Sequence, residues 1–87
     1  MESEVQAGIE LFKKECEKIL PGISIVIPVR PTAGAFLVSF SFDGFRTYGT
    51  IHEDDFADWG EGTDLLALRR QAEQFITKWR EGKKSPH

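Results

Sequence analysis

The dipeptide Asp43-Gly44 constrains this 87-residue chain most strongly, because it lies between two segments in which apolar residues alternate. Asp-Gly is typical of the two-residue turn of a β-hairpin, since both turn positions need positive φ angles. The sequence therefore predicts strands over about 35–42 and 45–52. A two-residue turn also fixes the register, and we expect the cross-strand partners Phe42–Phe45, Phe40–Thr47, Val38–Gly49 and Phe36–Ile51.

This register divides the hairpin into two different faces. The partners just named share one strongly apolar side, which we expect to face the core. The other side is mixed, and it is expected to carry Leu37, Ser39, Ser41, Arg46, Tyr48 and Thr50. Because side chains alternate along a strand, a slip of one residue would exchange the two faces completely.

Helical periodicity flanks the hairpin on both sides. A first helix is predicted up to Pro21-Gly22, and a last one from a Thr63 N-cap to about Gly82. Their expected buried stripes are Val5, Ile9, Phe12, Cys16, Ile19 and Leu20, and Leu65, Leu68, Ala72, Phe75, Ile76 and Trp79. Residues 23–29 alternate as a strand, with Ile23, Ile25, Ile27 and Val29 on one face. Because Pro28 has no N–H, the ladder should end near Ile27 or bulge at Pro28.

The segment 52–64 is predicted to be a long acidic connection, with one helical turn that places Phe56 and Trp59 over the core edge. Six acids fall within residues 53–64, and carboxylates are ligands of calcium, so a metal-binding loop is one alternative. The spacing of an EF-hand is absent. Acids also gather at helix N-termini, where the helix dipole favours them.

These segments predict one small α+β domain over residues 1–87, with a frayed tail at 83–87. The order α-β-β-β-α suits a three-stranded antiparallel meander with both helices on one face. Double-stranded RNA-binding domains have the same order of elements, and this likeness is an analogy between folds only. Their lysine cluster at the second helix and their Gly-Pro-x-His loop are not matched by Thr63-Asp64-Leu65 or by residues 28–32. No residue roles follow from this likeness.

Composition narrows the function classes. The formal net charge is −3, which argues mildly against nucleic acid as the main partner. The single cysteine, the absence of an apolar run of about 20 residues, and an acidic start unlike a signal peptide predict a cytoplasmic protein. His52 is the only internal histidine, and Gly60 and Gly62 flank a glutamate that would repel phosphate. We therefore expect no enzyme and no cofactor.

The mixed face of the hairpin is the first candidate binding surface, because tyrosine and arginine are typical interface anchors. We expect Leu37, Ser39, Arg46 and Tyr48 to bind a protein partner or a second copy of the chain in a homodimer. By composition alone, small acidic proteins of the inhibitor or immunity type belong to the same class. No membrane partner is expected.

A nucleic-acid-binding module is the alternative, with Arg30, Arg69, Arg70 and Lys78 as its phosphate contacts. The last helix and the tail are rich in lysine and arginine, while the segment that precedes them is acidic. The same distribution is ordinary compensation of a helix dipole.

Overall fold

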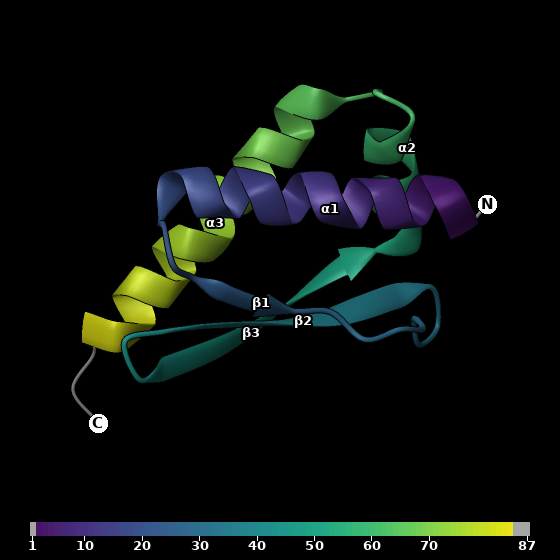
Figure 1. Ribbon diagram of the computed structural model, residues 1–87. Helices are drawn as coiled ribbons and strands as arrows, with labels where there is room; N and C mark the ends of the chain where they lie inside the picture. Colours follow the sequence, from purple (N-terminus) through teal and green to yellow (C-terminus); the bar gives the residue numbers. More distant parts are fainter. Residues whose placement is uncertain (1, 85–87) are drawn as a thin grey trace.

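The computed structural model describes residues 2–84 and confirms an α+β domain whose antiparallel sheet has its helices on one side (Figure 1). The elements are α1 (Glu2–Ile19), β1 (Ser24–Val26), β2 (Ala35–Phe42), β3 (Phe45–His52), α2 (Glu53–Gly60) and α3 (Leu65–Lys84). The strands lie in the order β1-β2-β3, which is the predicted meander. One helix, α2, is additional to the predicted order.

The central hairpin has the predicted register. Phe42 pairs with Phe45, and the ladder continues without a break to Ala35 and His52. Asp43 and Gly44 have φ angles of 51° and 81°, as the two-residue turn requires. On the helix side of β2, Phe36, Val38 and Phe40 are at most 2% exposed. The predicted core face is therefore confirmed.

The first strand is shorter than predicted, and its ladder ends at Val26, before Pro28. A second tight turn follows at Ala33-Gly34, where the amide and carbonyl of Thr32 bond those of Ala35 at 2.8 and 3.0 Å. Val29, which continues the alternation of this strand in the sequence, is 96% exposed. Beyond the end of the ladder no partner strand fixes the alternation, so the sequence pattern no longer indicates burial.

The predicted acidic connection is instead the two-turn helix α2. Glu53, Asp54 and Asp55 form its first turn, where the helix dipole favours acids. Phe56 and Trp59 are 0% and 1% exposed, so this helix belongs to the core rather than to its edge.

Two glycines allow α2 to touch α1. A Cβ atom at Gly8 would lie 1.8 Å from the Phe56 carbonyl oxygen, and one at Gly60 would lie 1.8 Å from the Glu4 carbonyl oxygen. No side chain fits at those distances, so the two backbones lie in direct contact.

Phe12 of α1 stands at the centre of the core. Its ring lies 5.8 to 6.1 Å from the rings of Phe40, Phe56, Trp59 and Phe75, which come from every other layer of the domain. Three of these contacts are edge-to-face, a favoured geometry for aromatic pairs. The aromatic residues thus join α1, α2, α3 and the sheet around one point.

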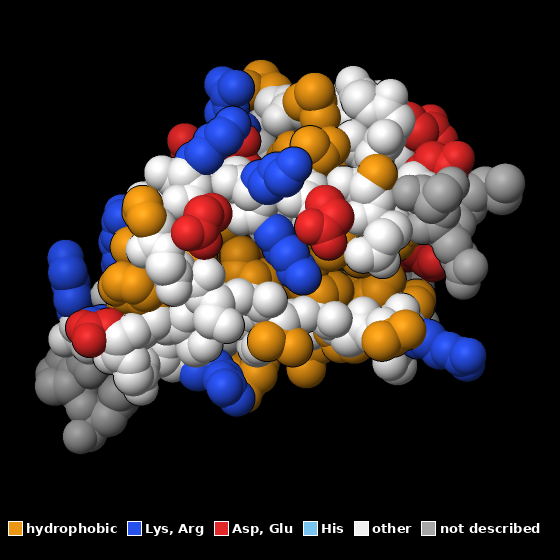
Figure 2. Space-filling model, in the orientation of Figure 1, with side chains coloured by type: hydrophobic (Ala, Val, Ile, Leu, Met, Phe, Trp, Pro, Cys, Tyr) orange, Lys and Arg blue, Asp and Glu red, His pale blue; other side chains and the backbone are white. Residues whose placement is uncertain are grey.

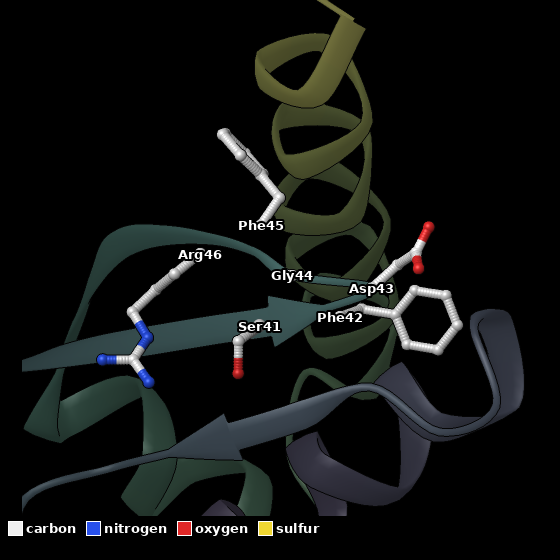
Figure 3. Close-up of a pocket in the computed structure, with 6 residues that line it drawn as sticks. All are labelled: Ser41, Phe42, Asp43, Gly44, Phe45 and Arg46. Carbon is white, nitrogen blue, oxygen red and sulfur yellow. The ribbon is translucent and has the colours of Figure 1, made fainter.

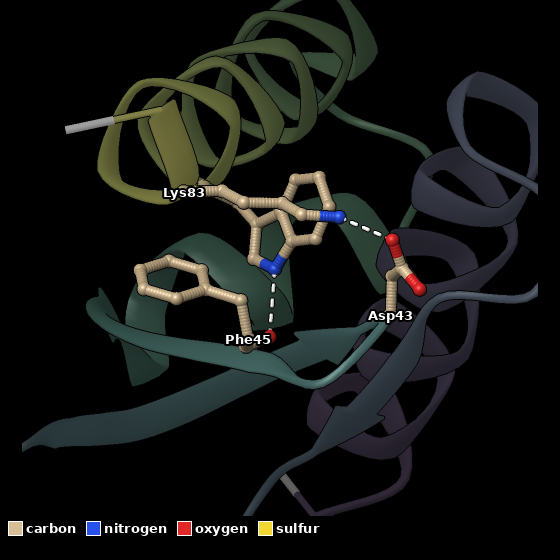
Figure 4. A network of polar contacts seen from close by, with 4 residues as sticks. Asp43, Phe45 and Lys83 are labelled. Carbon is tan, nitrogen blue, oxygen red and sulfur yellow. Dashed lines mark hydrogen bonds and ion pairs between the residues drawn. The ribbon is translucent and has the colours of Figure 1, made fainter. Parts of the chain in front are cut away.

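The last helix begins at Leu65, and the carbonyl of Asp64 accepts its first hydrogen bonds. Leu65 was predicted in the buried stripe and is 46% exposed. Lys83 and Lys84 are helical, so α3 extends into the predicted tail, and residues 85–87 lie outside the described residues. Trp79 donates from Nε1 to the Phe45 carbonyl at 2.9 Å, and Lys83 bonds Asp43, which fastens α3 to the hairpin (Figure 4). No helix among residues 2–84 is long and apolar enough to cross a bilayer.

Candidate functional site

The outer sheet face is the side of the sheet that the helices leave uncovered (Figure 1). The register and the alternation of side chains assign ten residues to it, namely Ser24, Val26, Ala35, Leu37, Ser39, Ser41, Arg46, Tyr48, Thr50 and His52. All four residues predicted to bind a protein partner lie on this face, and the structure brings them together.

The apolar members of the outer sheet face are neighbours. Val26, Ser39 and Tyr48 form one row across the three strands, because Ser39 pairs with both of the others. Leu37 lies two residues from Ser39 on β2. Val26 and Leu37 are each 58% exposed, and Tyr48 is 49% exposed, while the small Ser39 between them is half-buried. The result is one apolar patch with Ser39 at its centre.

The polar margin of this face lies at the hairpin turn. Ser41 and Arg46 are cross-strand partners, and their side chains project to the same side of the hairpin (Figure 3). The nearby carboxylate of Asp43 is engaged with Lys83, whose hydrogen bond and charge lower the pKa of that carboxyl. Within residues 2–84, Arg46 makes no ion pair, so its charge is free to meet a partner.

One backbone group on the outer edge of β3 is bonded to α3. Tyr48 belongs to a non-hydrogen-bonded pair of the hairpin, so its carbonyl points away from β2. Lys78 of α3 donates to this carbonyl at 2.8 Å. Lys78, which was predicted as a phosphate contact, thus makes a contact within the fold. The sequence pattern carried no signal for this bond, which joins residues 30 positions apart.

The predicted phosphate contacts do not all lie on one surface. Arg70 and Lys78 line a shallow depression on α3 together with Glu73 and Glu81, while Arg69 lies 3.8 Å from Glu15 of α1. Arg30 lies elsewhere, beside the N-terminal half of α1 and close to Glu53. No contact among the described residues brings Arg30 to the basic residues of α3.

Arg30 borders a groove that the sequence did not predict. The groove measures about 650 Å³, and its lining residues are Val5, Gln6, Ile9, Val29, Arg30, Pro31, Phe36 and Glu53. Hydrophobic side chains are visible between α1 and the sheet where it opens (Figure 2). Its walls are mainly apolar, and it carries one cation and one anion. The prolines on either side of Val29 were the available signal that this segment leaves the sheet.

The remaining chemistry-bearing residues are dispersed or buried. Within the part of the chain that the structure describes, no three His, Cys, Asp or Glu side chains gather as metal ligands would. Cys16 is buried on α1, and burial, together with the charge of Glu15, raises the pKa of its thiol to about 12. A thiol in this environment is an inert packing group rather than a nucleophile.

Comparisons with known proteins give this chain no relative. No family model matches it, and no significant match was found among curated proteins or solved structures. The surfaces of the domain are therefore the guide to its function.

Proposed function

We propose that this chain is a non-enzymatic interaction module that binds a protein surface through its outer sheet face. One observation carries the proposal: Val26, Leu37 and Tyr48 are about half exposed, and they surround Ser39 on a face that no helix covers. A cluster of large apolar side chains in water is costly unless something covers it, so such patches mark interaction sites. Arg46 supplies a polar anchor at the margin of the patch.

A cytoplasmic location is part of this proposal. The single cysteine is free and buried, which suits a reducing compartment. The chain has a modest net charge of −3, and a small acidic module of the inhibitor or immunity type is one form that the proposal takes.

The test is capture of partners from cells of the native host, with wild type compared with two variants. Tyr48→Glu places a charge in the apolar patch and should reduce partner recovery at least tenfold, because buried tyrosines are common binding hot spots. Leu65→Glu is the matched control, since Leu65 is 46% exposed against 49% for Tyr48 but lies on α3. Equal recovery with the two variants would overturn the proposal.

A further inference from the structure

The edges of the sheet offer little to a second strand. On the β3 side, Lys78 already bonds the outward carbonyl of Tyr48. On the other side, β1 has three residues, and Pro28 follows two residues after its end. Short strands, prolines and lysines are the usual protections against edge-to-edge pairing. A partner that meets the sheet therefore meets its outer face.

The outer sheet face has a symmetry of its own. Val26 and Tyr48 lie in one row with Ser39, at distances of about 4.8 Å on either side of it, since that is the spacing of neighbouring strands. A twofold axis parallel to β2, placed between two facing sheets, exchanges the positions of β1 and β3. In this arrangement Val26 of each copy faces Tyr48 of the other copy, and the two Leu37 side chains face each other.

Other orientations match less well. A twofold axis perpendicular to the strands, through the row of Ser39, sets Leu37 against Ser41 of the second copy. Val26 and Tyr48 then each face their own counterpart in the second copy, but Leu37 of each copy faces the hydroxyl group of Ser41. The axis parallel to β2 pairs every large apolar side chain with another, so the pattern of the face favours it.

Charge agrees with this arrangement. Arg46 is the only lysine, arginine, aspartate or glutamate among the ten positions of the outer sheet face. Under the axis parallel to β2, Arg46 faces Ser24 of the second copy, which pairs with Ser41 in its own sheet as Arg46 does. The two arginines stand on opposite strands and do not meet, so no like charges are brought together.

From these matches we infer that the partner of the outer sheet face is a second copy of this chain, packed face to face about a twofold axis nearly parallel to β2. Aligned sheets of this kind cross at about 30° and lie about 10 Å apart. Strands of three, eight and eight residues give a footprint of about 300 Å² per copy. Stable interfaces bury about 800 Å² per partner, so the dimer is weak and forms at high concentration.

The test uses complementary charges. Light scattering of wild type should show the mass rising from monomer toward dimer between about 10 μM and about 1 mM, the range of weak interfaces. Val26→Lys and Tyr48→Glu should each remain monomeric. An equimolar mixture of the two variants should dimerise, because the new lysine of one copy faces the new glutamate of the other. Leu66→Lys is the control and should dimerise as wild type does, since Leu66 is 58% exposed on α3, as Val26 is on β1.

Because this inference rests on the proposed function, its failure must be recognisable by itself. A wild type that stays monomeric at about 1 mM overturns the inference. Capture of a different protein that Tyr48→Glu abolishes would then still support the proposed function. A wild-type dimer whose two charged variants fail to combine overturns the twofold axis. Far-ultraviolet circular dichroism checks the fold of each variant, and concentration-dependent amide shifts of wild type must concentrate on the outer sheet face.

Discussion

Consecutive residues of β2 lie in opposite environments. Phe36, Val38 and Phe40 are at most 2% exposed and pack beneath the helices, whereas Leu37, between the first two, is 58% exposed. The backbone is the same for both sets, and only the alternation of side chains separates them. Packing beneath the helices restricts which side chains fit on the inner side, while those on the outer sheet face contribute little to the core. A surface of the second kind can change for recognition without endangering the fold.

Truncating one residue on each face gives the sharpest form of this comparison. Phe40→Ala should lower the free energy of unfolding by about 3–5 kcal/mol, because it leaves a cavity next to Phe12 and Phe75. Leu37→Ala should change it by no more than about 0.5 kcal/mol, as exposed substitutions usually do. Urea titration of dilute protein measures both. Similar losses for the two variants would break the comparison.

The helix side also contains a site where an added methyl group should destabilise the domain. Alanine is favoured over glycine in a helix by about 0.5–1 kcal/mol, yet Gly8→Ala should destabilise the domain by about 1–3 kcal/mol. The new methyl group would overlap the backbone of α2 at Phe56. Gly82→Ala is the control, because a Cβ there meets only the edge of the Phe45 ring, at 3.1 Å. Thermal unfolding should rank Gly82→Ala above Gly8→Ala, and the reverse order would contradict the close helix contact.

A small dependence of stability on pH is expected from the hairpin turn, where the two faces of the sheet meet. The pKa of Asp43 is lowered from its ordinary value of 3.8 by the hydrogen bond from Lys83 and then by its charge. A lowered folded pKa gives stability that is present above the unfolded value and lost as the pH falls through the folded one. The small advantage of wild type over Lys83→Met should therefore shrink on acidification below pH 3.8. Lys84→Met should show no such trend in melting temperature.

The smallest expected effect concerns nucleic acid. Duplex RNA and duplex DNA should give no gel shift at low salt, because Lys78 bonds a carbonyl and Arg30 lies apart from Arg69 and Arg70. A shift that weakened steeply with salt and with substitution of Arg69, Arg70 or Lys78 would instead assign recognition to α3 rather than to the outer sheet face.

The hairpin was predictable because its information is local. Asp43-Gly44 fixes the turn, the turn fixes the register, and the register places Leu37, Ser39, Arg46 and Tyr48 on one face. Only one turn of the helix α2 was predicted, because its acidic first turn is equally typical of a loop. Its packing depends on a close contact with α1 that both Gly8 and Gly60 make possible, and these two glycines lie 52 positions apart in the sequence. Local patterns carry no information about such distant contacts.

The contact of Lys78 was missed for the same kind of reason, whereas the end of the first ladder was predicted near Ile27 and lies at Val26. Alternation extended to Val29, but whether a strand is present depends on a partner strand to receive its hydrogen bonds. The role of Lys78 depends on where α3 crosses β3, which no periodicity specifies. The candidate face itself was predictable, while the state of its two edges required the three-dimensional arrangement.

The tryptophans and the tyrosine lie in different parts of the molecule, so their spectroscopic signals report different regions. The chain has two tryptophans and one tyrosine. Trp59 and Trp79 are 1% and 4% exposed on the helix side, whereas Tyr48 is half exposed on the outer sheet face. Tryptophan emission therefore reports the interior of the domain, and the ring resonances of the tyrosine report its binding surface. Anything that covers the face would change the tyrosine signal and leave both tryptophans undisturbed, so binding and unfolding can be followed separately in unlabelled protein.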